Sequence, residues 1–279
     1  YKRQQGRNFC SKIWNAFRLI KGWTVDDNIQ APDAAKLAVH WFESKQNEVA
    51  AEVADLFSKY RLSEALMAVY KLFWDEFSSW YLEMIKPAYG QGIDRTTYDA
   101  TLCFLDNLLH LLHPFMPFIT EELWQQMYER NAEEGESLMV SALSMDTYVD
   151  TAFVAQFEVV KGVISNIRSI RLQKNIAQKE PLDLQVLGEN PVAEFNAVIQ
   201  KMCNLSSITV VESKAEGASS FMVGTTEYAV PLGNMIDVEA EIARMEAELK
   251  HKEGFLQGVL KKLSNEKFVN NALSLIHIS

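Results

Sequence analysis

The stretch LMAVYKLFWDEFSSWYLEMIKP, residues 66–87, decides the fold class. Its apolar side chains recur at helical spacing, and Pro87 ends the pattern. A helix with one apolar stripe must bury that stripe against other helices. The segment therefore predicts a helical bundle, with these residues facing the core: Leu66, Val69, Phe73, Trp80 and Met84.

Four further helices are expected around this one. The first ends at Gly22, the second begins at Pro32 and Asp33, and the fourth begins with Asp94 as its N-cap. Two prolines, Pro114 and Pro117, then break the fourth helix, and a short fifth helix has Glu121 and Glu122 in its first turn and also contains Trp124. The apolar residues expected to face the core in the first helix are Phe9, Ile13, Phe17 and Ile20.

The pattern changes after a polar stretch at residues 131–150, which suggests a domain boundary. Helical and strand-like segments then alternate, as in a small α+β unit. The expected helices are 153–174 and 191–202, and the expected strands are 182–187, 208–211 and 227–232, with a polar turn at 212–220.

From Val238 to Leu263 the apolar positions alternate in steps of four and three, which is typical of a coiled-coil helix. The alternative is a surface helix that packs on its own domain. The chain is thus expected to be mainly α, with a helical bundle (1–148), a small α+β linking domain (149–236), a coiled-coil arm (237–270) and a short tail (271–279).

Composition sets limits on location and class. The 279 residues carry a net charge of −10, and no apolar run reaches the roughly 18 residues of a membrane span. The basic first residues lack the apolar segment of a secretory signal. The cysteines Cys10, Cys103 and Cys203 are few and far apart, which favours reduced thiols and a cytoplasmic protein without a membrane partner.

Basic side chains concentrate in the first helix against this acidic background. Up to Val25 the only charges are six lysines and arginines. Steps of about 100° per residue place Arg3, Arg7, Arg18 and Lys21 in one sector of the helix, together with Trp14, and Asn8 and Asn15 flank that sector. Cations around a planar ring suit single-stranded RNA, although a solvated basic face with Trp14 against a neighbouring helix would give the same pattern.

A second stretch without acids, residues 159–179, includes Arg168, Arg171 and Lys174 near a helix end. These side chains could contact RNA, or they could complement the helix dipole.

A catalytic centre cannot be assembled from these residues. Asp106, His110 and His113 share a helix face, but leucines surround them and no further metal ligand is signalled. We therefore predict no metal and no catalytic residue. A hydrolase that uses Asp106 and His110 remains a minor alternative, and a helical scaffold that oligomerises through its heptads and binds no RNA is the main one.

Two motifs carry a family resemblance. GRNFCSKIWNA, residues 6–16, resembles the opening of the anticodon-binding bundle of valyl-tRNA synthetases, and LHPFMPFITEELW, residues 112–124, is similar to a signature of the related class I enzymes. Three later stretches are similar to the C-terminal extension of the valyl enzymes: residues 166–182, residues 231–241, and KKLSNEKFV at residues 261–269.

The resemblance implies tRNA(Val) as partner and an arm that reaches the outer corner of the tRNA. It places Arg7, Lys12, Asn15 and Arg18 among the anticodon contacts, with Trp14 or Trp23 as the base-stacking ring. ATP, magnesium, valine activation and editing would belong to a parent enzyme, expected to be monomeric, and this fragment would be inactive and without cofactors. The tail after Ala272 departs from the family and is similar to a cloning-derived sequence, so the arm through residues 238–263 could self-associate.

Overall fold

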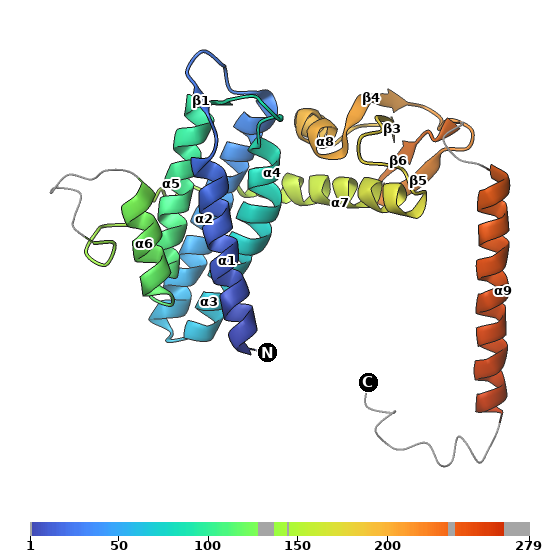
Figure 1. Cartoon of the computed structure of the whole chain (residues 1–279). Helices are drawn as coiled ribbons and strands as arrows, with labels where there is room; N and C mark the ends of the chain where they lie inside the picture. The colour runs from blue at the N-terminus through green and yellow to red at the C-terminus, as the bar shows by residue number, and fades with distance from the viewer. Residues whose placement is uncertain (1, 128–136, 144, 234–237, 265–279) are drawn as a thin grey trace. The chain divides into compact units, whose positions relative to one another are not determined.

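The computed structural model describes residues 2–127, 137–143, 145–233 and 238–264. Two compact units are present, Tyr1–Pro231 and Leu232–Ser279. The first contains a helical bundle and a small sheet with its own helices, and the second contains one long helix (Figure 1).

The bundle is formed by helices that stand side by side (Figure 1). A chain of aromatic rings fills its centre: Phe42 lies 5.3 Å from Phe77 and 4.9 Å from Tyr81, between ring centroids. The predicted starts at Asp33 and Asp94 are confirmed, and the Thr97 N–H donates to the Asp94 carboxylate over 2.8 Å. The helices are α1 (Lys2–Lys21), α2 (Asp33–Ser58), α3 (Leu62–Lys71), η1 (Leu72–Tyr81), α4 (Leu82–Ile85), α5 (Arg95–Leu112) and α6 (Pro117–Met127).

The helix expected across residues 66–87 contains a π-helical segment, η1, in its middle. A π turn is wider than an α turn, so the buried stripe shifts to Leu72, Phe73, Phe77 and Tyr81. Leu66, which was expected to face the core, is 36% exposed, so that expectation was wrong. Pro117 begins α6, which puts Glu121 one turn further into the helix than predicted.

Two short strands, which the sequence did not reveal, join loops at one end of the bundle. β1 (Val25–Asp26) pairs in parallel with β2 (Ile93–Asp94). A Cβ at Gly92 would lie 3.0 Å from the Thr24 carbonyl oxygen, so the close approach of the two loops depends on glycine at this position.

The α+β part of the first unit is a four-stranded sheet of order β4-β3-β6-β5. The prediction for β3 is confirmed, whereas β5 lies partly within the residues expected to form a polar turn. β3 is parallel to β4 and antiparallel to β6, and β5 is antiparallel to β6. The elements are α7 (Thr151–Gln173), β3 (Leu182–Leu187), η3 (Ala193–Phe195), α8 (Asn196–Cys203), β4 (Leu205–Val211), β5 (Ser219–Val223) and β6 (Thr226–Val230).

Helix α7 joins this sheet to the bundle. On the bundle side, its Phe157 stacks on Trp41 of α2 with ring centroids 4.2 Å apart. On the sheet side, a Cβ at Gly162 would lie 3.0 Å from a Val223 methyl group, so α7 approaches β5 closely. Lys161 strengthens the junction, because its Nζ lies 2.6 Å from the Glu76 carboxylate.

The second unit contains α9 (Val238–Leu263), which confirms a long helix where the heptads begin. Leu249 and Leu256 of the heptad seam are 58% and 57% exposed. The tail 271–279 and most of the motif 261–269 lie outside the described residues. Within the described part of the chain, no helix combines the length and the apolar character needed to cross a bilayer.

Candidate nucleic-acid interface

Helix α1 is amphipathic, and its apolar side fixes its orientation. The predicted core residues of this helix are all buried, and Phe9 packs against Tyr70 and Phe73 with ring centroids 4.7 and 5.8 Å apart. α1 contacts η1, α5 and α6 through this side. The opposite side is thereby held towards solvent.

The exposed side of α1 carries a polar set that spans about 100° of the helix circumference. We call this set the α1 polar face, and all of its members are exposed: Arg7, Asn8, Ser11, Asn15 and Arg18. It offers two guanidinium groups, two amides and a hydroxyl, which are donors and acceptors suited to phosphates and base edges.

Within the described residues, Arg7 and Arg18 have no acidic partner, which distinguishes them from most other exposed cations of the first unit. Several exposed basic side chains elsewhere lie within 4 Å of a carboxylate: Lys36 with Asp33, Lys59 with Asp55, Arg61 with Glu64, Arg95 with Asp27, and Lys214 with Glu227. The positive charge of the α1 polar face is therefore not neutralised locally, and an anion can approach it.

The other predicted residues near α1 are half-buried or already hydrogen-bonded. Lys12 is half-buried, with its Nζ 5.3 Å from the centre of the Trp74 ring. Lys21 is exposed but donates to the Met127 carbonyl over 2.8 Å. Trp14 and Trp23 are half-buried, so part of each indole lies at the surface. The ring centroids of Trp14 and Phe17 are 6.4 Å apart.

The second predicted set lies on and after α7. Arg168 is exposed, and its guanidinium lies 5.5 Å from the Trp80 ring of η1. Lys174 is half-buried at the C-cap of α7. The structure therefore keeps the two sets on separate helices, although both touch η1.

Arg171 does not present its charge to solvent, which corrects the expectation that it offers a surface cation. It is 1% exposed, and its guanidinium donates to four backbone carbonyls. These belong to Ala177, Glu180, Cys203 and Asn204, at 2.7–3.3 Å. The hydrogen bonds of Arg171 thus connect the loop after α7 with the C-terminal end of α8.

Trp74 and Trp80 were missed as neighbours of the basic side chains. Trp80 was assigned to the core stripe, but the π turn leaves it half-buried, where Lys161 and Arg168 both lie within 6 Å of its ring. The sequence around Trp74 and Trp80 does not indicate these cation–ring contacts, because the cations belong to α1 and α7.

His110 forms a hydrogen-bonded chain that has a structural explanation. Its Nε2 lies 2.8 Å from the Ser141 hydroxyl, and its Nδ1 lies 2.9 Å from the Asp106 carbonyl. The Ser141 hydroxyl also donates to the Leu138 carbonyl over 3.0 Å. The chain ties the segment after α6 to α5, and it gives no support to a hydrolase.

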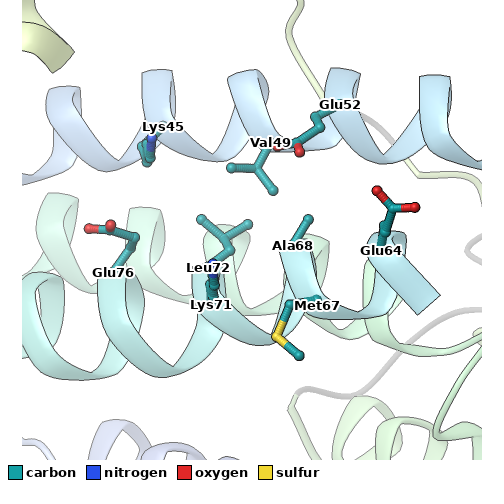
Figure 2. A pocket seen from close by; sticks show the side chains of 9 residues that line it. All are labelled: Lys45, Val49, Glu52, Glu64, Met67, Ala68, Lys71, Leu72 and Glu76. Atoms are coloured by element: carbon teal, nitrogen blue, oxygen red, sulfur yellow. The ribbon is translucent and has the colours of Figure 1, made fainter. Parts of the chain in front are cut away.

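Among the described residues, no group of three or more His, Cys, Asp or Glu side chains could hold a metal ion. A groove of about 330 Å³ lies between α2 and the α3–η1 helix, and Figure 2 shows both signs of charge along it. Burial would lower the pKa of Lys45, but the hydrogen bond to Glu48 and the charges of Glu48, Glu76 and Glu158 raise it. Since three glutamates outnumber two lysines in its lining, the groove does not favour an anion.

The chain belongs to the family described as the anticodon-binding domain of tRNA ligase, whose model matches residues 39–186. The match begins inside α2, so α1 lies before it. Curated relatives extend the similarity over most of the chain. A valine-tRNA ligase of Bacteroides thetaiotaomicron is 98% identical over 269 residues, and one of Phocaeicola vulgatus is 71% identical over 269 residues.

A more distant relative, a valine-tRNA ligase of Enterococcus faecalis, is 34% identical over 282 residues. Each of the three alignments covers 95–96% of this chain and 30–31% of the relative. The chain therefore spans about a third of the length of the curated relatives it matches. These findings support an RNA-binding role and lend nothing to a separate scaffold role.

Proposed function

We propose that this chain is the tRNA-binding region of a valine-tRNA ligase and that the α1 polar face contacts the anticodon arm of tRNA(Val). The observation that carries the proposal is the exposure of Arg7 and Arg18 without acidic partners, on a helix whose other side is locked in the core. Asn8 and Asn15 would add base-edge contacts, and Lys12, Trp14, Lys21 and Trp23 would border them.

Arg168 and Lys174 form a proposed second contact, placed on α7 and apart from the first. Arg171 would act there only by holding the loop of residues 174–180 in shape. The arm α9 is proposed to reach the outer corner of the tRNA, or to pair with a second copy through residues 238–263 when no other helix covers it.

The attachment of valine to tRNA, with its use of ATP and magnesium and its editing step, is proposed for the remaining two-thirds of the relatives' length. This chain would contribute binding energy that orients the acceptor end, and it would have no aminoacylation activity by itself. A cytoplasmic, monomeric parent enzyme completes the proposal.

The test is a salt titration of the binding of this chain to a valine tRNA transcript. Phosphate contacts release counterions, so the affinity should fall steeply as salt rises, and Arg18→Ala should reduce the slope of log Kd against log salt by about one. Lys214→Ala is the matched control, because Lys214 is a partly exposed cation on the sheet that is paired with Glu227. Absence of any salt-dependent binding would leave the α1 polar face as a solvated surface.

A further inference from the structure

The turn that follows α7 is held by side chains from two helices. It comprises residues 177–180, all of them exposed, and we call it the 177–180 turn. Arg171 of α7 donates to its first and last carbonyls over 2.9 Å, and Nδ2 of Asn204 donates to its two middle carbonyls over 3.2 and 3.0 Å. The N–H of Glu180 closes the turn on the Ala177 carbonyl over 3.1 Å. All four carbonyls of this exposed turn therefore already accept hydrogen bonds.

The backbone at Asn204 is shaped for this contact. Asn204 ends α8 with a φ of 50°, in the left-handed region, which asparagine adopts more readily than most residues that have a Cβ. Arg171 is 1% exposed, so its donors are directed to the backbone rather than to solvent. A turn that is fixed from two sides keeps its remaining polar groups in one arrangement, and such preorganisation lowers the entropic cost of binding a ligand.

The polar groups that the 177–180 turn leaves available are mainly hydrogen-bond donors. Within the described part of the chain, the backbone N–H groups of Gln178 and Lys179 donate to no acceptor. The Lys179 side chain is exposed, and none of the described carboxylates lies within 4 Å of its ammonium. Successive N–H groups of a turn beside a cation form a site that suits an anion.

The charges around the 177–180 turn also favour an anion. Its one acid is Glu180, whose negative charge acts on the buried guanidinium of Arg171. Arg168, which is exposed one helical turn before Arg171, acts with its positive charge on Cys203, beside Asn204. Positive charge therefore exceeds negative charge here, although the whole chain has a net charge of −10.

We propose that the 177–180 turn binds a phosphate group of the RNA backbone, through the N–H groups of Gln178 and Lys179 and the ammonium of Lys179. The proposal rests on the proposed function, because it takes the RNA to be the tRNA that α1 contacts. The site consists mainly of backbone donors and is additional to the side chains of Arg168 and Lys174. Phosphate contacts fix the register of a nucleic acid but carry no base information. The turn should therefore strengthen the binding of a tRNA whatever its anticodon.

The test measures the affinity of this chain for a valine tRNA transcript, and for the same transcript with its anticodon replaced, over a range of salt. Lys179→Gln should weaken the binding of both severalfold and reduce the slope of log Kd against log salt by about one. Lys214→Gln, which removes a cation that is paired with Glu227, should change neither quantity. A loss confined to the valine anticodon would overturn the proposal, because it would place Lys179 against a base.

A proline tests the backbone donor. Gln178 is the second residue of the turn, a position that favours proline, so Gln178→Pro removes the N–H and suits the turn. Gln178→Ala is the matched control, because it removes the side-chain amide and keeps the N–H. We expect Gln178→Pro to bind both transcripts severalfold more weakly than Gln178→Ala, with the same urea midpoint for the two variants. If the proline variant unfolds more easily, Lys179→Gln decides, because it changes only an exposed side chain.

Unchanged affinity and salt slope for Lys179→Gln would overturn the proposal and leave the role of α1 intact. Absence of tRNA binding by the unsubstituted chain would overturn both. A free phosphate ion shares the chemistry of the RNA backbone, so thermal unfolding is also compared in inorganic phosphate and in chloride at equal ionic strength. If phosphate stabilises the chain, and Lys179→Gln abolishes this without changing RNA binding, the turn is a site for the free anion and the RNA contact is overturned.

Discussion

The guanidinium of Arg171 donates to the backbone carbonyl of Cys203 over 2.7 Å, although the two residues are 32 positions apart. Arg171 lies near the end of α7 and Cys203 ends α8, so this hydrogen bond joins two helices that lie on either side of β3 in the sequence. Three further carbonyls accept from the same guanidinium. The buried guanidinium therefore stabilises the α+β region, because an apolar side chain in its place could not donate hydrogen bonds to these carbonyls.

Replacing Arg171 by alanine should destabilise the chain by about 3 kcal/mol or more, because several buried carbonyls would lose a charged donor. Urea unfolding, followed by circular dichroism, measures this. Arg168→Ala, which removes an exposed arginine one turn earlier, should cost less than about 1 kcal/mol. Equal costs for the two variants would contradict the role given to Arg171.

Cys203 should react with alkylating reagents only when the chain unfolds. Burial raises the pKa of its thiol to about 12, which the positive charges of Arg168 and Arg171 only partly offset. At pH 8 we expect its alkylation, followed by mass spectrometry, to be more than about a hundredfold slower than that of the exposed Cys103. Comparable rates in the folded protein would show that this region opens readily.

Phe157 should be essential for the junction between α7 and the bundle. It stacks on Trp41 at 4.2 Å and also contacts Trp80 and Phe195, so Phe157→Ala should cost about 3–5 kcal/mol in unfolding free energy. Leu172→Ala on the same helix is the control, since Leu172 is 83% exposed and should change stability by about 0.5 kcal/mol or less. A small loss for Phe157→Ala would mean that α7 is not held by this packing.

Glu121 should make stability depend on pH in the acid range. Burial alone would raise its pKa, but hydrogen bonds from Gln125, Ser137 and the Leu138 N–H, with the charge of His113, lower it below 4.5. A depressed folded-state pKa stabilises the protein above the unfolded value, and this contribution is lost as pH falls through the folded value. Urea unfolding between pH 6 and pH 3 should therefore show that the unfolding free energy of the unsubstituted chain falls more steeply with decreasing pH than that of Glu121→Gln.

Much of the bundle could be predicted from local signals. The N-cap Asp94 and the stop at Pro87 depend on chemistry within a few residues, and both helix boundaries are found where these residues stand. The π-helical segment showed no local signal, and its buried rings Phe77 and Tyr81 pack against rings of α2 and α5 that are distant in the sequence. The strand β5 was missed for a similar reason, since its pairing with β6 is a tertiary contact.

The candidate site was predictable in part. The exposure of Arg7 and Arg18 follows from the helical period, because the buried positions Phe9, Ile13 and Phe17 define the opposite side. The burial of Arg171 does not follow from any local pattern, since its partners come from a distant helix end. The long-range ion pairs of other cations, such as Arg95 with Asp27 and Lys214 with Glu227, likewise do not follow from a local pattern.

The most direct test of the central claim compares two RNAs by fluorescence anisotropy at low and moderate salt. One is a valine tRNA transcript, and the other is the same transcript with its anticodon replaced. The account predicts tighter binding of the valine anticodon, with Arg7→Ala and Arg18→Ala each costing roughly 1–3 kcal/mol and Lys214→Ala costing nothing measurable. Equal affinity for the two RNAs, unchanged by Arg7→Ala, would contradict an anticodon-reading role for α1.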